Sequence, residues 1–301
     1  MKTLHLSPSK VAAYENCPRA YFYQYVLRIK SSEESVNLGF GSCIDETFEK
    51  FVLGMTKGEP IDTITVFDAS WSRYLQSNTV VFSSRFSADD LRETGRSLAQ
   101  QLPNAWDEAA LVPVFDREGK PILQRSLSVD VGNNVVLNTK LDILAMNFNG
   151  EIGVVDVKAP SSASSEIFAA NAEQLTAYQA TVDAHREAFG IHKVSFVAYW
   201  EFLKKKVPGP KSKRGTEGPK IRTPQPVPAR SDDDVNEYVQ KLHAIADNIR
   251  ARRFYKSPRM AFNTPCELCA FARLCIDRDA SGYVLPSDLT HDQLVGARPT
   301  G

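Results

Sequence analysis

The sequence contains no long hydrophobic run. Met1 to Leu6 holds no apolar stretch long enough for a signal peptide, and no later segment is apolar enough to span a bilayer. We therefore expect a cytoplasmic protein without a membrane partner.

The sequence also has no excess of charge, since 36 basic residues balance 36 acidic ones. Any nucleic-acid surface must then be a local patch. A phosphate-binding loop of the form G-x4-G-K-[ST] is absent as well, which excludes a helicase or an ATP-driven motor. With 301 residues, 43% of them hydrophobic, the chain is ordinary globular material for one large domain or two modest ones.

Cysteine is scarce, and its count of five is odd, which argues against a disulfide framework in a reducing compartment. Cys266, Cys269 and Cys275 form a compact group of thiols, and Cys17 is the candidate for a fourth ligand. This set fits either a four-thiolate zinc site or an iron–sulfur cluster. Cys43 is left over, and we expect it to pack in a helix.

A predicted β-hairpin, residues 138–158, carries the most informative residues. Short β-branched runs flank Asn149-Gly150, which is a strong hairpin signal. A three-residue loop ending in a left-handed Gly150 sets Asp142 directly across from Asp156.

Two carboxylates opposed on neighbouring strands lie about 5 Å apart and repel each other. Either one of them takes a proton or a divalent cation lies between them, and such oxygen sites suit magnesium or manganese. Lys158 is on the same face as Asp156 and could balance the pair by itself. An ordinary salt-bridged strand face therefore remains an alternative.

Before this hairpin the pattern is mostly helical. After a loop around Gly39 and Gly41, residues 42–53 form an amphipathic helix on which Asp45 and Glu49 share a face. A solvated acidic face would explain these two residues equally well. Residues 63–111 carry buried apolar stripes and predict a helical insertion.

Strands and one helix surround the hairpin. A strand from Pro121 to Val131 precedes it, and a helix from Ala172 to Phe189, capped by Asn171, follows it. His192 to Trp200 returns to strand. This order predicts an α/β (α+β) fold with a mixed central sheet and flanking helices.

Residues 204–230 form a basic segment, rich in Pro and Gly, with nine Lys or Arg residues against the single acidic Glu217. It is predicted to be a loop, serving either as a solvated linker or as a phosphate-contacting segment. A long helix from the acidic run at Asp232 to about Phe254 follows.

Four motifs in one order resemble a known group of enzymes. They are L-S-P-S-K-V-A-A-Y-E-N-C-P-R-A-Y-F-Y near the start, an Asp followed by D-x-K, then Q-x3-Y, and C-x2-C-x5-C near the end. Together they resemble the RecB/AddB-like branch of the PD-(D/E)xK nucleases, which includes CRISPR-associated exonucleases with an iron–sulfur cluster and similar phage proteins. The resemblance runs from about residue 6 to residue 276, apart from the helical insertion and the basic segment.

The resemblance implies a restriction-endonuclease-like core in which Asp142 and Asp156 are metal ligands. Lys158 would orient or polarise the attacking water, and Gln174 and Tyr178 would support the site or contact DNA.

The resemblance further implies a [4Fe-4S] cluster, with zinc as the alternative, that joins the two chain ends. The implied ligands are Cys17, Cys266, Cys269 and Cys275.

One position departs from the family pattern. Where relatives usually have G-x3-H, this chain has Gly41-Ser42-Cys43-Ile44-Asp45. We expect Asp45 to ligate Mg²⁺ or Mn²⁺ together with Asp142, Asp156 and the Val157 carbonyl. The alternative is that Asp45 marks a weakened enzyme.

The expected function is metal-dependent DNA exonuclease activity on single strands or DNA ends, in repair, recombination or CRISPR adaptation. A helicase, a recombination protein or a CRISPR integration protein would be its partner. The alternative is a catalytically weakened iron–sulfur DNA-binding subunit of a recombination or spacer-acquisition complex.

The chain is expected to divide into four segments. They are N-terminal helices (1–30), a helical subdomain (31–112), a nuclease core (113–255) that contains the basic segment, and an iron–sulfur region with a tail (256–301).

Overall fold

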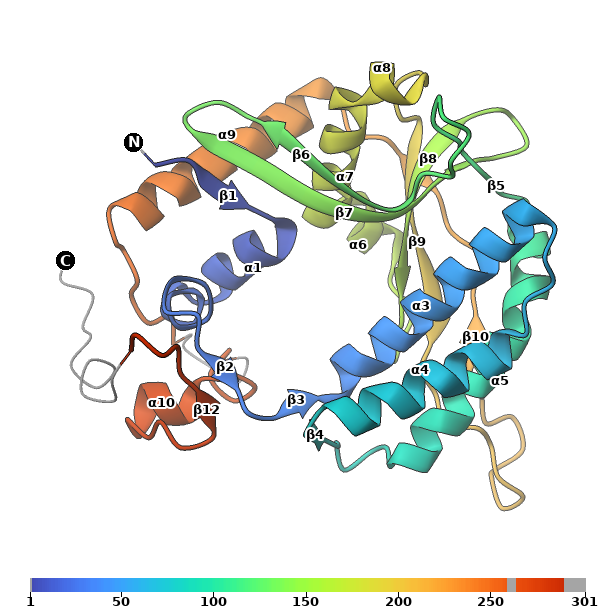
Figure 1. Cartoon of the computed structure of the whole chain (residues 1–301), viewed down its shortest axis with the longest axis horizontal. Coiled ribbons are helices and arrows are strands. Elements are labelled where there is room, and N and C mark those ends of the chain that lie inside the picture. Colours follow the sequence, from blue (N-terminus) through green and yellow to red (C-terminus); the bar gives the residue numbers. More distant parts are fainter. Residues whose placement is uncertain (1, 259–263, 290–301) are drawn as a thin grey trace. The chain divides into compact units, whose positions relative to one another are not determined.

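The computed structural model describes residues 2–258 and 264–289 (Figure 1). The chain forms two compact units, each built from separated segments. The sheet unit comprises Glu34–Leu127 and Thr139–Asp232. The terminal unit comprises Met1–Glu33, Ser128–Asn138 and Asp233–Gly301.

A mixed sheet forms the centre of the sheet unit, and the predicted mixed α/β fold is confirmed. β7 (Val135–Met146) runs antiparallel to β8 (Ile152–Lys158), and β8 runs parallel to β9 (Phe196–Leu203). Every residue of β9 is buried, which is typical of a strand covered on both faces. Four further strands pair with β7 or β9: β5 (Val112–Pro113), β6 (Leu123–Asp130), β10 (Lys220–Ile221) and β11 (Val227–Pro228).

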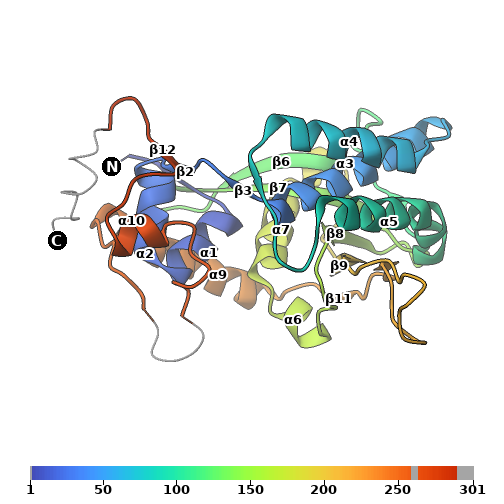
Figure 2. The ribbon, with the colours of Figure 1, turned by 90° about the horizontal axis from the view of Figure 1, so that it is seen from below.

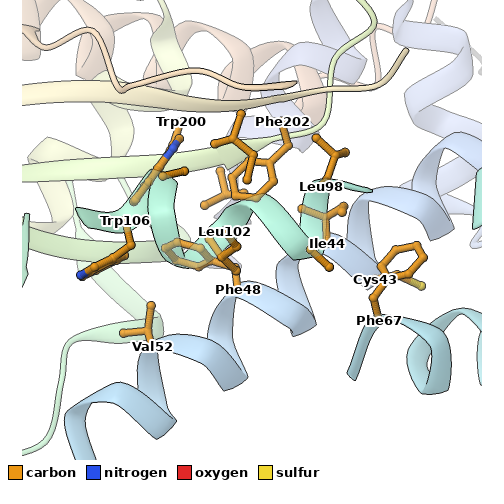
Figure 3. Packing of buried hydrophobic residues seen from close by; sticks show 14 of the residues in the cluster. Cys43, Ile44, Phe48, Val52, Phe67, Leu98, Leu102, Trp106, Trp200 and Phe202 are labelled. Atoms are coloured by element: carbon orange, nitrogen blue, oxygen red, sulfur yellow. The ribbon is translucent and has the colours of Figure 1, made fainter. Parts of the chain in front are cut away.

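Three long helices cover one face of this sheet, as Figure 2 shows: α3 (Val36–Lys57), α4 (Thr63–Ser77) and α5 (Ala88–Ala109). Of these, α4 and α5 confirm that residues 63–111 are mostly helical. Their apolar side chains meet those of β9 in an aromatic core (Figure 3). Trp106 of α5 stacks on Trp200 of β9 with ring centroids 5.5 Å apart, and Phe48 of α3 packs edge-on against Trp200. These contacts fix α3 against the strands. A separate strand pair precedes α3 and α5: β3 (Glu34–Ser35) and β4 (Val80–Val81).

Short helices cover the opposite face: α6 (Glu166–Ala170), α7 (Glu173–Ala184) and α8 (Arg186–Phe189). Leu175 and Val182 of α7 pack in one cluster with Val154 of β8 and Val197 of β9. Because side chains alternate along a strand, the polar residues of β8 that share a face with Val154 also lie toward α7.

Gly39 and Gly41 lie inside α3, so the predicted loop at these glycines is wrong. Gly39 packs beneath Tyr74 of α4, and a Cβ at Gly39 would lie 1.8 Å from the Tyr74 ring. Glycine inside a helix costs about 1 kcal/mol relative to alanine. Here the missing side chain lets two helices approach each other closely, which a propensity argument does not anticipate.

The predicted cap of α7 is also wrong. Ala172 is its N-cap, while Asn171 ends α6 and donates its side-chain amide to the Ile167 carbonyl at 2.8 Å. The amide therefore closes one helix instead of opening the next. Gly190 ends α8 in the left-handed region at φ 70°.

The boundaries around β9 differ from the prediction as well. The strand begins at Phe196 and not at His192, because the Val194 N–H donates to the Asp183 carboxylate at 2.8 Å and not to a strand. The basic segment 204–230 is not a loop throughout, since it contains β10 and β11.

The terminal unit brings the two ends of the described chain together. The Tyr14 hydroxyl donates to the Arg253 carbonyl at 2.7 Å, and the Arg19 guanidinium donates to the Phe254 carbonyl at 2.8 Å. Its elements are β1 (Leu4–Leu6), which pairs with the start of β7, α1 (Pro8–Asn16), α2 (Pro18–Tyr21), the π-helix η1 (Phe22–Val26), β2 (Lys30–Ser31), most of α9 (Asp232–Arg250), α10 (Ala272–Ile276) and β12 (Tyr283–Val284). Within residues 2–258 and 264–289, no helix combines the length and apolar composition that crossing a membrane requires.

Candidate active site

The β7–β8 hairpin has the predicted register. Ile143 pairs with Val155, and the ladder continues from there to the turn. Gly150 lies in the left-handed region at φ 78°, as the predicted three-residue loop requires. The register prediction is therefore confirmed from Ile143 to the turn, while the predicted Asp142–Asp156 pair lies beyond the end of the ladder.

Asp142 lies one residue beyond the Ile143–Val155 pair. Its carboxylate accepts the Val157 backbone N–H at 2.8 Å and the Gln124 side-chain amide at 3.1 Å. Two donors from neighbouring strands thus fix the orientation of this carboxylate.

The alternation of faces along β7 slips by one residue at Asp142. Before it, Thr139 shares a hydrogen bond with Thr181 of α7 (Oγ1 to Oγ1, 2.7 Å), and Leu141 packs in the cluster beneath α7. After it, Leu144 packs in that cluster. In a regular strand only every second residue faces α7, whereas here the interval between Leu141 and Leu144 is three residues. The extra residue acts as a β-bulge does and redirects the Asp142 side chain.

Asp156 is fully buried beneath α7. Its Oδ2 lies 2.5 Å from Lys158 Nζ, and its Oδ1 lies 3.4 Å from the Gln174 side-chain amide. Gln174 also donates to the Tyr178 hydroxyl at 2.6 Å. The Lys158 side chain is 40% exposed, so the ion pair joins a buried carboxylate to an ammonium that solvent can reach.

Burial and the negative charge of Asp142 disfavour ionisation of Asp156 and Asp45. Burial raises the pKa of Asp156 to about 7 against the lowering effect of Lys158, and the Asp142 carboxylate adds to the rise. Burial also raises the pKa of Asp45, on α3, to about 7, with Asp142 as the next cause. Carboxylates from α3, β7 and β8 thus repel one another in a poorly solvated place, which a cation would relieve.

The Lys158 ammonium and the Tyr178 phenol keep their protons. Burial lowers the pKa of Lys158, but the carboxylates of Asp156, Asp142 and Asp45 outweigh this effect and raise the pKa overall. Burial and the nearby Asp156 carboxylate raise the pKa of Tyr178, so its phenol stays neutral.

Gln124 is a site residue that sequence reasoning missed. It is held at φ 46°, in the left-handed region that a glutamine rarely adopts, while its amide donates to Asp142. No sequence signal marks it, because it lies on β6, away from the recognisable motifs.

A cavity of about 750 Å³ opens beside Lys158. Residues that follow β8, from Ala159 to Ser165, form much of its wall, and Gln174 borders it. Phe168 of α6, also in the wall, is 59% exposed and stacks on Tyr199 with ring centroids 5.8 Å apart. The cavity is large enough for a small ligand or a nucleotide.

The four predicted cluster cysteines line a second cavity, of about 240 Å³, within the terminal unit: Cys17, Cys266, Cys269 and Cys275. Burial raises the pKa of Cys269, and the neighbouring thiols of Cys17, Cys275 and Cys266 add to the rise. Cys43 is buried in α3, as expected.

The predicted residues thus gather in two places. Asp45, Asp142, Asp156, Lys158, Gln174 and Tyr178 interact in the sheet unit, where Val157 donates its N–H to Asp142, while the four thiols lie in the terminal unit. As the side chains stand in the described ranges, no group of three or more His, Cys, Asp or Glu residues converges closely enough to hold a metal ion. The carboxylates are therefore coupled by charge without meeting at one point, and the four thiols line one cavity without converging on a metal position.

Comparison with known proteins places this geometry in a family. No curated protein matches the chain. A solved structure titled "Crystal structure of SSO0001" is similar at 11% identity and a TM-score of 0.33, covering 93% of this chain and 89% of that one. The mixed sheet with flanking helices is consistent with the predicted restriction-endonuclease-like fold. A family model described as the PD-(D/E)XK nuclease superfamily matches residues 5–276. Nucleases of this kind generally use divalent metals such as Mg²⁺ or Mn²⁺. The chain belongs to the PD-(D/E)XK nuclease superfamily.

Proposed function

We propose that this protein is a Mg²⁺- or Mn²⁺-dependent DNA exonuclease that hydrolyses phosphodiester bonds in single strands or at DNA ends. The observation that carries the proposal is the buried Asp156, which contacts Lys158 and is coupled by charge to Asp142. A purely structural salt bridge would not need a second carboxylate whose repulsion raises the pKa of the first.

The donor chemistry of the site suits a hard divalent cation. Asp45, Asp142, Asp156 and the Val157 carbonyl would supply oxygen ligands from three elements. Burial raises the pKa values of Asp45 and Asp156, and the like charge of Asp142 adds to the rise, so a bound cation would stabilise their ionised forms. When bound, the cation polarises the scissile phosphate and supplies an activated water.

The chain's own residues prepare the reaction. Lys158 brings a permanent positive charge beside Asp156, where it would stabilise negative charge that develops on the phosphate. Gln174 orients Asp156 from α7 and is itself bound to the neutral Tyr178 phenol. Both α7 residues are thus proposed to position the carboxylate, and Gln174, which borders the cavity, to contact the DNA as well.

The test is a panel of substrates and metals on protein purified without oxygen. Single-stranded, duplex and gapped DNA would each be incubated with Mg²⁺, Mn²⁺ or EDTA. The proposal expects degradation in Mn²⁺ or Mg²⁺ and none in EDTA. Glu49→Gln, one turn from Asp45 on α3, is the matched control for Asp45→Asn, and only the second variant should lose activity.

We further propose that the protein belongs to the RecB/AddB-like branch and holds a [4Fe-4S] cluster. The proposal is supported by the ligand type, because four thiols line one cavity and the thiols of Cys17, Cys275 and Cys266 add to the burial that raises the pKa of Cys269. Arg19 and Lys256 also line it and would offset the charge of an anionic cluster. Anaerobic protein should absorb visible light and contain about four irons per chain. Colourless protein with one zinc would replace the cluster with a zinc site.

A second candidate function rests on Asp45, which stands where the family usually has histidine. In this alternative the chain is a DNA-binding subunit of a recombination or spacer-acquisition complex with weakened catalysis. The same panel separates the two, since DNA binding without cleavage in either metal would favour the binding subunit.

The partners and the four-segment division stay proposals. Because the sequence has no phosphate-binding loop for ATP, we propose that a helicase, a recombination protein or a CRISPR integration protein opens duplex substrates. The proposed segments keep their boundaries: 1–30, 31–112, 113–255 and 256–301.

A further inference from the structure

Lys204 is a buried cation that the proposed reaction does not use. It follows β9 directly and is only 5% exposed. Its ammonium donates to the Asn37 side-chain oxygen and lies 5.6 Å from the centroid of the Phe40 ring. Within the described residues, no carboxylate lies within ion-pair distance of it.

The neighbouring basic residues are neutralised, which makes Lys204 an exception. Lys205 pairs with Glu217, and Lys206 pairs with Asp90 at 2.9 Å. A buried charge is ordinarily paired, because removing it from water is costly. Burial lowers the pKa of Lys204, so the folded chain bears this cost.

Arg85 is a second cation whose charge acts on Lys204. Its positive charge also lowers the pKa of Lys204, so the two groups repel each other. In the part of the chain that the structure describes, Arg85 has no ion pair and lies over the Phe86 ring at 5.4 Å. Lys204 is thus a buried cation with a second, exposed cation acting on it, and an anion from outside the chain would stabilise this arrangement.

A backbone hydrogen bond connects Lys204 to the wall of the cavity at the candidate active site. The Lys204 N–H donates to the Pro160 carbonyl at 2.7 Å, and Pro160 lines the cavity beside Lys158. Asn37 and Asp45 are both on α3, about 12 Å apart along its axis at 1.5 Å per residue.

The surface of α3 between these two residues is open. A Cβ at Gly41, midway between Asn37 and Asp45, would meet nothing within 4 Å. The N-cap Ser35 makes no side-chain capping hydrogen bond, so the first-turn N–H groups add positive potential at this end.

We propose that Lys204 and Arg85, at the first turn of α3, bind a phosphate group of the DNA substrate. This inference rests on the proposed nuclease function. A phosphate oxygen would take the place of the Asn37 amide oxygen at the Lys204 ammonium, while Arg85 would contact the same phosphate from the exposed side. The substrate would then run along the open face of α3 toward Asp45.

The test measures DNA binding separately from cleavage. A labelled single-stranded oligonucleotide is titrated in EDTA at several salt concentrations against wild type, Lys204→Met and Arg85→Gln. Each variant should bind roughly tenfold more weakly, because each loses a charge-assisted hydrogen bond. Loss of the phosphate contact should reduce the slope of log K against log salt by about 0.7.

Lys206→Gln is the matched control, because it removes a neighbouring charge that is already paired with Asp90. It should change affinity and slope little. Thermal unfolding supplies a second readout for Lys204→Met, which should leave the melting temperature unchanged or raise it. A melting temperature several degrees lower would mean that Lys204 serves the fold, and this would overturn the proposal.

The phosphate could be internal or terminal, and oligonucleotides with a 5′-phosphate or a 5′-hydroxyl separate these sources. Preference for the phosphorylated end in wild type, lost in Lys204→Met, assigns the site to a terminal phosphate. Equal weakening with both ends assigns it to a backbone phosphate. Unchanged affinity and slope in Lys204→Met would refute the inference even if wild type cleaves DNA. Wild type that neither binds nor cleaves DNA would instead refute the proposed function.

Discussion

The carboxylate cluster of the sheet unit and the cysteine cavity of the terminal unit are built in opposite ways. Asp142, Asp156 and Lys158 lie on one hairpin, so local register brings them together, and the ammonium already contacts one carboxylate. Three of the four thiols are close in sequence, but Cys17 comes from the other end of the chain and reaches their cavity only through tertiary packing. The first site should therefore keep its structure without its metal, whereas metal binding at the second should be coupled to folding.

The largest effect expected is on cleavage by Asp156→Asn. Activity should fall by at least about a hundredfold, because charge stabilisation at a metal-assisted phosphate is worth several kcal/mol. Stability should change little, since the neutral amide also relieves repulsion with Asp142. Initial rates and urea unfolding measure the two effects.

Asp183→Asn is the control for this variant, because Asp183 is another aspartate whose pKa burial raises, and it accepts the Val194 N–H outside the cluster. It should lower stability and leave the rate per folded molecule intact. Equal loss of rate in both variants would remove the distinction between a catalytic and a structural carboxylate.

A smaller effect is expected from Cys275→Ser, which changes the cysteine cavity of the terminal unit. The free energy of unfolding should fall by on the order of several kcal/mol, with loss of bound metal and of visible absorbance, if metal binding there is folding energy. Cys43→Ser, in the α3 core, should keep the absorbance. Retained iron and stability in Cys275→Ser would break the comparison between the sites.

The free energy of unfolding of the metal-free protein should depend on pH. The pKa values of Asp45 and Asp156 are about 7 in the folded chain and about 3.8 when unfolded. The folded state therefore holds protons more tightly, and this contribution to stability is complete below pH 4 and lost as the pH rises through 7. Added Mg²⁺ should stabilise the protein more at pH 8 than at pH 5 in urea titrations. Equal stabilisation at both would speak against these carboxylates as ligands.

The smallest effect is expected from Gln124→Gly. Glycine removes the cost of φ 46°, about 1 kcal/mol, but also removes the amide donor to Asp142. Stability should stay level or rise slightly while the cleavage rate falls several-fold. A rate equal to wild type would show that the strain at Gln124 has no role in positioning Asp142.

The sequence predicts the parts of this molecule that depend on neighbouring residues. The hairpin register, the left-handed Gly150 and the same-face placement of Lys158 all follow from strand geometry, and the structure confirms them. Apolar stripes at helical spacing likewise predict the helices of residues 63–111, and the order of strands and helix predicts the mixed sheet.

The features that the sequence does not predict depend on residues that are distant in the chain. Glycine disfavours helices and so predicts a loop at Gly39, but the role of Gly39 is set by Tyr74 on another helix. The slip at Asp142, the strained Gln124 and the unneutralised Lys204 are consequences of packing between elements, and no local pattern encodes them.

The most direct test of the carboxylate site is Mn²⁺ binding, measured by electron paramagnetic resonance of free Mn²⁺ at pH 8 in wild type and Asp156→Asn. Asp45→Asn is measured in the same way, and the iron content of the three proteins is matched beforehand. We expect at least one site in wild type that is lost in Asp156→Asn and weakened in Asp45→Asn. Equal Mn²⁺ binding by all three proteins would contradict this expectation.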